Sequence, residues 1–282
     1  MHIEIAVPAA DELGECPVWL HATQQLLRVD IHAPAIVLRD AGSERRRTVA
    51  APVGFALPAA SGGIVTGVGR ELVSLDDLDA APRLIAAVEP GRTANRFNDA
   101  VCDPRGRLWA GTMSTTRVPG TAALYRLEPG GMPEVALPGV TISNGLDFNL
   151  DATRLYYVDS PAQRIDAIDF DVDRGRLGAR RPFARIEPED GLPDGLCVDA
   201  DGGVWLALFG GGALRRYTPG GVLEDHIELP VTNPTCPAFG GPDLSTLYVT
   251  SARYRLAAPE PLAGSLLRLR PGVSGRPTHA FG

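Results

Sequence analysis

Short runs of apolar and β-branched residues recur along the 282-residue chain, each preceded by a turn rich in Gly, Asp, Asn or Ser. Such runs between turns predict β-strands. Apolar residues do not recur at the three- to four-residue spacing of an amphipathic helix over any useful length. The pattern therefore predicts an all-β chain, with strands at QLLRVDI (25–31), GIVTGV (63–68), RLWAGTM (107–113), RLYYVDS (154–160), GVWLALF (203–209) and TLYVTSA (246–252).

These runs belong to a longer repeat. The segment NDAVCDPRGRLW (98–109) aligns position for position with DGLCVDADGGVW (194–205), and related units start at 15, 54, 144 and 236. Six consecutive units of about this size, with roughly four strands each, predict a six-bladed β-propeller formed by 1–282 as one domain. GSLLRLRP (264–271) and HIEIAV (2–7) would complete the last blade. A β-sandwich or two smaller β domains are the alternatives, but Pro and Gly are spread evenly and mark no linker.

Charge and composition narrow the possible partners. All 27 cationic residues are Arg, and the absence of Lys excludes Schiff-base chemistry and a Walker P-loop. The net charge of −7 makes nucleic acid an improbable partner. No apolar stretch approaches the roughly 18 residues of a membrane span. We therefore expect neither nucleic acid nor a membrane as a partner.

The first residues and the cysteines bear on the compartment. MHIEIAVPAADELGE carries acids where a secretion signal needs a basic region followed by an apolar one. The four cysteines, Cys16, Cys102, Cys197 and Cys236, form no CxxC pair. We expect reduced, buried thiols rather than disulfides or a zinc knuckle, and a cytoplasmic protein.

The residue that opens each repeat is expected to lie beside the central channel, because a propeller places equivalent positions at equivalent heights around one axis. These residues are Glu15, Gly54, Asn98, Asn144, Asp194 and Cys236. Four of the six carry carboxylate or carboxamide oxygens, with two formal negative charges, which suits one divalent cation such as Ca²⁺, Mg²⁺ or Mn²⁺. At any single position, the preference of Asn and Asp for turns is the simpler explanation of the residue. Four such residues at equivalent positions of the repeat instead favour metal binding.

The same segments resemble a known family. GECPVW (14–19), NRFNDAVCDPRGRLWAGTM (95–113), ISNGLDFNLDATRLYYVDS (142–160) and PDGLCVDADGGVWLALFGGG (193–212) resemble the gluconolactonase family, also called senescence-marker protein or regucalcin-like. FGGPDLSTLYVTSAR (239–253) and PLAGSLLRL (261–269) resemble its bacterial sugar-lactonase branch.

The resemblance implies a six-bladed propeller with one divalent metal ion in the channel. By motif, Glu15, Asn144 and Asp194 correspond to metal ligands. Arg96 and Asn98 correspond to residues that orient the substrate, and we interpret Asp99 as lying behind them. In some animal members acidic residues after GTM reach the sugar, whereas this chain has Ser114-Thr115-Thr116. That departure leaves the preferred sugar open.

The implied activity is hydrolysis of sugar-acid (aldono) γ- or δ-lactones to aldonic acids. A divalent ion, whether Ca²⁺, Mg²⁺, Mn²⁺, Zn²⁺ or Fe²⁺, would polarise the carbonyl, and Asp194 would act as general base. The nearest alternative is a phosphotriesterase or aryl-ester hydrolase of the same fold. A non-catalytic calcium- or metabolite-binding propeller is another alternative. A protein-interaction propeller would carry recurrent His and Trp-Asp motifs, which the chain lacks.

Overall fold

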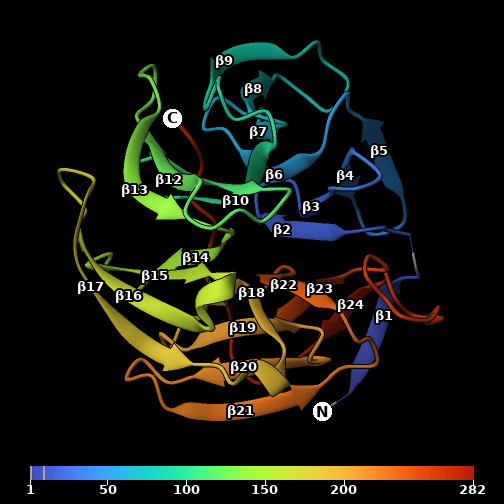
Figure 1. Cartoon of the computed structure of the whole chain (residues 1–282). Coiled ribbons are helices and arrows are strands. Elements are labelled where there is room, and N and C mark those ends of the chain that lie inside the picture. Colours follow the sequence, from blue (N-terminus) through green and yellow to red (C-terminus); the bar gives the residue numbers. More distant parts are fainter. Residues whose placement is uncertain (1, 9) are drawn as a thin grey trace.

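The computed structural model describes residues 2–8 and 10–282. Within this part of the chain, 24 strands form six four-stranded antiparallel sheets. The sheets are arranged around a common centre (Figure 1), and the first strand of each packs against the first strands of its two neighbours. The protein is therefore an all-β, six-bladed propeller. The predicted fold class is confirmed, and the alternative of a β-sandwich is wrong.

The blades are numbered in chain order. Blade 1 consists of β2 (Gly14–Leu20), β3 (Gln25–Asp30), β4 (Ala35–Arg39) and β5 (Glu44–Thr48). Blade 2 consists of β6 (Val53–Pro58), β7 (Ile64–Val68), β8 (Glu71–Leu75) and β9 (Arg83–Ala87). Blade 3 consists of β10 (Asn95–Cys102), β11 (Leu108–Ser114), β12 (Ala122–Leu127) and β13 (Glu134–Val140). Blade 4 consists of β14 (Ser143–Phe148), β15 (Arg154–Asp159), β16 (Arg164–Asp171) and β17 (Arg176–Arg185). Blade 5 consists of β18 (Leu192–Val198), β19 (Val204–Phe209), β20 (Ala213–Tyr217) and β21 (Leu223–Glu228). Blade 6 consists of β22 (Pro234–Gly240), β23 (Thr246–Ser251), β24 (Leu266–Leu269) and the N-terminal strand β1 (Ile3–Val7).

Helical structure in the described residues is limited to two short 3₁₀ turns, η1 (Ser160–Ala162) and η2 (Pro188–Asp190). Neither has the length or apolar character that a membrane-crossing helix requires.

Each strand predicted from an apolar run is the second strand of its blade, namely β3, β7, β11, β15, β19 and β23. A second strand lies between two partners of its own sheet, and its two faces are covered by the neighbouring blades. In β19, for example, the side chains from Val204 to Leu208 are all buried. Continuous apolar runs are typical of strands covered on both faces, which is why the sequence reveals these strands best.

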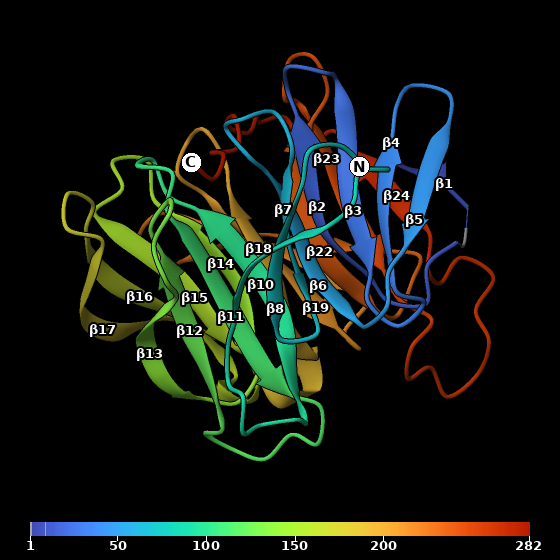
Figure 2. The same ribbon diagram turned by 90° about the horizontal axis from the view of Figure 1, so that it is seen from above.

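The two ends of the chain meet in blade 6. The N-terminal strand β1 pairs antiparallel with β24, with Ile3 opposite Leu269 and Ile5 opposite Leu267 (Figure 2). The predicted completion of this blade by the N-terminal strand is therefore confirmed. Pairing the first strand of the chain with the last one completes the sixth blade and closes the ring.

The repeat recognised in the sequence has a structural cause. Asp103 and Asp199 occupy equivalent turns, and their carboxylates accept hydrogen bonds from the indole N–H groups of Trp109 (3.0 Å) and Trp205 (2.8 Å). Both indoles are fully buried between blades. Trp19 is also buried and stacks on Tyr248. All three tryptophans are therefore core residues rather than a sugar-stacking platform.

The C-terminal segment 271–282 crosses the middle of the ring, where Figure 1 shows it in dark red. The carbonyl of Ser274 accepts a hydrogen bond from Ala200 N (2.8 Å), and Phe281 N donates to Pro58 O (2.9 Å). Arg276 donates to the carbonyl of Phe148 (2.7 Å). The segment thereby ties together blades 2, 4 and 5 across the channel.

Candidate active site

The first strand of every blade contains a β-bulge at the repeated position. The register with the second strand shifts at Glu15/Val18, Val53/Phe55, Phe97/Ala100, Asn144/Leu146, Pro193/Leu196 and Pro234/Pro237. A bulge bends its strand and redirects the side chains beside it. The six positions aligned from the sequence therefore share one backbone distortion, repeated around the channel.

One cavity, at the end of the channel where the first strands begin, contains all the residues assigned to the site from their motifs. It is lined by Glu15, Arg96, Asn98, Asn144 and Asp194, among others. Each of these five residues is less than 9% exposed. Gly54 and Cys236, which open the other two repeats, do not line this cavity.

Glycines at the bulges allow the first strands to approach each other. A Cβ atom on Gly145 would lie 2.5 Å from the carbonyl oxygen of Asp194, and one on Gly54 would lie 2.5 Å from the carbonyl carbon of Phe97. Real Cβ atoms essentially never come so close to backbone atoms. Glycine at these positions therefore permits the close strand spacing that brings Asn144 beside Asp194.

The side chain of Asn144 is held by three hydrogen bonds. Its amide nitrogen donates to a carboxylate oxygen of Asp194 and to the hydroxyl of Ser160 (3.1 Å). Its amide oxygen accepts from the N–H of Gly145 (3.2 Å). Asn144 therefore connects blades 4 and 5 directly at the floor of the cavity.

Glu15 enters the cavity from blade 1 and has few protein contacts of its own. Its carboxylate accepts one long hydrogen bond, from the N–H of Cys16 (3.4 Å). The chain before it is fixed by Asp30, which accepts hydrogen bonds from the N–H groups of Glu12 (2.9 Å) and Leu13 (3.1 Å). Glu15 therefore presents a carboxylate that the backbone positions but that little else in the protein satisfies.

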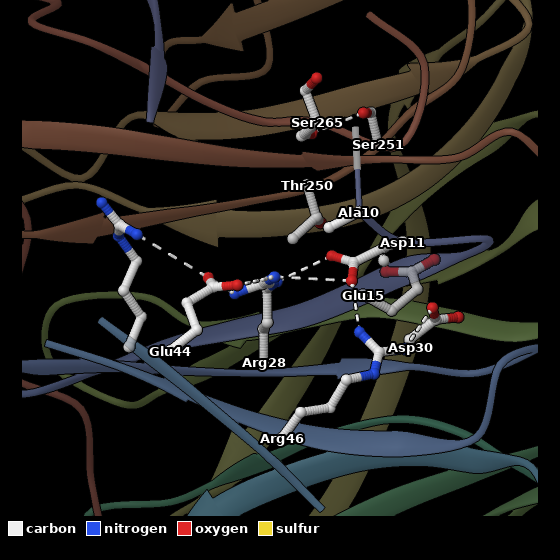
Figure 3. Close-up of polar contacts among 12 residues, drawn as sticks. Ala10, Asp11, Glu15, Arg28, Asp30, Glu44, Arg46, Thr250, Ser251 and Ser265 are labelled. Atoms are coloured by element: carbon white, nitrogen blue, oxygen red, sulfur yellow. Dashed lines mark hydrogen bonds and ion pairs between the residues drawn. The ribbon is translucent and has the colours of Figure 1, made fainter. Parts of the chain in front are cut away.

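Figure 3 shows a network of charged side chains beside Glu15. Arg28, which is completely buried, pairs with Asp11 (2.8 Å) and Glu44 (2.6 Å). Arg46 pairs with Asp11 (3.0 Å) and with Asp30 (2.7 Å). These paired charges hold the segment that leads into β2 and Glu15.

The two carboxyl groups of the cavity, Glu15 and Asp194, form no ion pair with any of the described residues. Burial raises the pKa of Glu15 well above its usual range, and the charges of Asp194 and Asp99 raise it further. Burial likewise raises the pKa of Asp194, against the opposing effect of its hydrogen bond with Asn144. Buried carboxylates without a partner are costly unless a proton or a cation neutralises them. The site is thus electrostatically prepared for a bound cation.

The positive charge of Arg96 lowers the pKa values of both carboxyl groups, but its hydrogen bonds go elsewhere. Its guanidinium donates to the amide oxygen of Asn98 (2.7 Å) and to the carbonyl of Phe97 (2.8 Å). Burial lowers the pKa of Arg96 to about 10, so it remains protonated at neutral pH. Asn98 in turn donates to the carbonyl of Ser143 (2.8 Å), which fixes the pair at the cavity wall.

The donor set fits a hard divalent cation. Glu15 and Asp194 supply carboxylate oxygens and Asn144 supplies a carboxamide, which are the donors that Ca²⁺, Mg²⁺ and Mn²⁺ prefer. Across residues 2–8 and 10–282, no three His, Cys, Asp or Glu side chains are grouped as a metal site. An ion at this position would therefore need the amide oxygen as its third protein ligand, as the motifs imply.

Asp99 faces a different cavity, farther along the channel. This second cavity is lined by Asp99, by all four cysteines and by residues 276–279 of the C-terminal segment. Burial, with a further contribution from Asp147, raises the pKa of Asp99 to about 7. The four cysteines are free, as predicted; three are buried and Cys197 is half-buried. Burial raises their thiol pKa values, which keeps the thiols protonated.

Several other residues that line the first cavity were not identified from the sequence. They are His32, Met113, Arg117, Ser160, Phe209 and Tyr254, from loops and strand ends of five different blades. Thr115 of the Ser114-Thr115-Thr116 segment also lines the cavity, and its hydroxyl donates to the carbonyl of Ala94 (2.7 Å). These loops differ from blade to blade, so the repeat gives no signal for them.

The comparisons with known proteins agree with this architecture. The SMP-30/gluconolactonase/LRE-like family model matches residues 13–253. Regucalcin from Bos taurus is 37% identical over 281 residues, covering 95% of this chain and 94% of that protein. The structure of a calcium-binding protein, regucalcin from Agrobacterium tumefaciens, has a TM-score of 0.92 at 27% identity, covering 99% of this chain and 98% of that one.

A gluconolactonase from Xanthomonas campestris has a TM-score of 0.79 at 23% identity, covering 95% of this chain and 89% of that one, and shares the fold. The family match covers most of the chain, and it includes every residue assigned above to the cavity floor. The chain therefore belongs to the SMP-30/gluconolactonase/LRE-like family, as its motifs had indicated.

Proposed function

We propose that the protein is a metal-dependent lactonase that opens sugar-acid γ- or δ-lactones to aldonic acids. The observation that carries this proposal is the pair of buried carboxyl groups, Glu15 and Asp194, which lie without an ion-pair partner among the described residues in the same cavity as the protonated Arg96. Membership of a family named for gluconolactonase supports the reaction class. The calcium-binding relative from Agrobacterium tumefaciens supports a divalent cation.

In this proposal Glu15, Asn144 and Asp194 hold the cation. When bound, it supplies Lewis-acid polarisation of the lactone carbonyl and stabilisation of the developing oxyanion. Asp194 accepts a proton from the attacking water through the carboxylate oxygen that is not engaged by Asn144. Arg96 and Asn98, locked together at the wall, orient the hydroxyl groups of the sugar.

Two other functions remain as alternatives. A phosphotriesterase or aryl-ester hydrolase would use the same cation and the same base on a different bond. A calcium- or metabolite-binding protein without catalysis would need the cation but no base. The lactonase proposal is favoured over pure binding because Arg96 and Asn98 line the same cavity as Asp194 while contributing no carboxylate to it.

The test compares lactone, paraoxon-like and aryl-ester hydrolysis on metal-stripped protein, with each metal added back. We expect a divalent ion to restore hydrolysis of at least one aldonolactone. Asp194→Asn, assayed at metal saturation established by calorimetry, should reduce turnover by about 10²–10⁴-fold, because an amide cannot accept the proton.

The matched variant is Asn144→Asp, which keeps an oxygen ligand and removes no base, so its activity should fall less. Full activity in metal-free wild type would refute the metal dependence. Equal turnover of wild type and Asp194→Asn at full metal occupancy would refute the general-base role and leave the metal-binding role intact.

A further inference from the structure

Two exposed arginine side chains at the mouth of the site cavity have no acidic partner among the described residues. Arg117 lines the cavity from the loop after β11. Arg255, in the loop after β23, lies with its guanidinium carbon 5.4 Å from the ring centroid of Tyr254, which also lines the cavity. Within residues 2–8 and 10–282 neither guanidinium takes part in an ion pair or a hydrogen bond, whereas Arg28 and Arg216 elsewhere each pair with two carboxylates.

The loop geometry fixes Arg117 at this position. Its N–H donates to the carbonyl of Ser114 (2.9 Å), which closes a tight turn, and its backbone has a left-handed φ of 56°. Ser114 and Thr116 are hydrogen-bonded to each other through their hydroxyls (3.0 Å). The segment thus contributes no carboxylate to the mouth and places one guanidinium there.

The charge of the cavity is unbalanced once its carboxylates are engaged. Glu15 and Asp194 are the acidic groups among the described residues that line it. A divalent cation held by these two carboxylates is neutralised by them, which leaves the positive charges of Arg96 and Arg117 without a counterion. Glu12, near the mouth, already faces Arg253 at 3.8 Å. Burial, together with repulsion from Arg255, lowers the pKa of Arg117, as expected where positive charges gather.

We infer that the site is selective for lactones that carry an anionic group remote from the ring carbonyl, bound by Arg117 with Arg255 beside it. This inference rests on the proposed lactonase function and names its substrate class. The anionic group is a carboxylate, as in the lactone of an aldaric acid, or a phosphate monoester, as in the lactone of a phosphorylated aldonic acid. A guanidinium presents planar paired donors that match both groups. Unpaired positive charge at a cavity mouth also attracts anions before they bind.

The experiment measures kcat/KM for three lactones on the metal-loaded protein: neutral glucono-lactone, glucaro-lactone with a carboxylate, and 6-phosphoglucono-lactone with a phosphate. Wild type is compared with Arg117→Gln and Arg255→Gln, which keep the Cβ atom and hence the backbone strain. Arg176→Gln is the control, because Arg176 is an exposed residue of the outer strand β17.

We expect wild type to favour one anionic lactone over the neutral one by about tenfold or more, the scale of one charge-assisted hydrogen bond. Arg117→Gln should reduce that ratio about tenfold, and Arg255→Gln should reduce it less. Added NaCl should also reduce it, because salt screens exposed charges. Which anionic lactone is preferred distinguishes carboxylate from phosphate. Preference for the neutral lactone, or an unchanged ratio in Arg117→Gln, would overturn the inference.

A second measurement separates this inference from the proposed function. If no lactone is hydrolysed, the lactonase proposal fails, and binding is then compared by calorimetry for glucarate, 6-phosphogluconate and gluconate. Tighter binding of glucarate or 6-phosphogluconate than of gluconate, lost in Arg117→Gln but kept in Arg176→Gln, would support the anion-binding mouth. Equal or undetectable binding of all three compounds would overturn it.

Discussion

Asp99 provides a stability prediction that can be worked out from the structure. Its side chain is 8% exposed, and one carboxylate oxygen accepts a hydrogen bond from the N–H of Ala100 (2.8 Å). Burial and the charge of Asp147 raise its pKa from 3.8 to about 7. The folded protein therefore binds the Asp99 proton more tightly than the unfolded chain does. As a result, stability is lost as the pH rises from about 4 to about 7, and the loss is complete above pH 7.

Replacing Asp99 by Asn removes this loss, because the amide does not titrate and can still accept from Ala100. A pKa raised from 3.8 to about 7 corresponds, at about 1.4 kcal/mol per pH unit, to about 4 kcal/mol at pH 8.5. At pH 5 the same relation gives about 2 kcal/mol. The stability of Asp99→Asn relative to wild type should therefore be about 2 to 3 kcal/mol higher at pH 8.5 than at pH 5. Any pH-independent effect of the substitution cancels in this difference.

The assay is urea unfolding of both proteins at the two pH values, in EDTA so that no cation in the neighbouring cavity alters the pKa of Asp99. Asp201→Asn serves as the control, because Asp201 is exposed in the turn between β18 and β19 and should give a difference near zero. The reasoning is refuted if Asp99→Asn has the same relative stability at both pH values, or if wild type gains relative stability at pH 8.5.

Three further predictions follow from single contacts. Arg96→Lys should lower kcat/KM for the best lactone by about tenfold to several hundredfold in steady-state kinetics, since an ammonium lacks the planar array of donors that a guanidinium turns toward Asn98 and a substrate; unaltered kinetics would place Arg96 outside the reaction. Arg28→Met should destabilise by about 3–5 kcal/mol in urea unfolding, because Asp11 and Glu44 would lose their buried partner, and Arg83→Met at an exposed ion pair should cost about 1 kcal/mol or less; equal costs would contradict the argument. Deleting 272–282 should cost about 3 kcal/mol through the lost hydrogen bonds across the channel, and a chain of unchanged stability would show that the segment does not tie the blades.

The fold was predictable because each blade repeats the same pattern of apolar and turn residues in the sequence. The second strands are covered on both faces and read as continuous apolar runs, and the Asp103–Trp109 and Asp199–Trp205 pairs recur at the same spacing. The outer strands give a weaker signal: β5 (Glu44–Thr48) and β21 (Leu223–Glu228) are largely exposed and polar. A strand that only one partner holds and that solvent covers can tolerate almost any polar sequence.

The cavity floor was predictable for the same reason, since Glu15, Asn144 and Asp194 occupy equivalent places in the repeat. The mouth was not. Arg117, Arg255 and His32 lie in connections whose length and composition differ from blade to blade, so alignment of the repeats cannot bring them together. Asp99 shows another limit: it neighbours Asn98 in the sequence, yet it lines the other cavity. Adjacent strand residues face opposite ways, and only the structure shows which cavity each side chain reaches.

The six bulges suggest how one repeat can serve both stability and chemistry. Every first strand bends at the same place, and the bend sets the direction of the side chain there. The first strands of the two adjacent blades pack against it and hold its backbone in place. Where the position is glycine, as at Gly54, the space is taken by the next strand; where it is acidic or an amide, the side chain reaches the cavity. Changing one residue in one repeat can therefore change the donor set without changing the ring. Loops outside the repeat, such as the one that carries Arg117, can vary independently and alter which ligand reaches those donors.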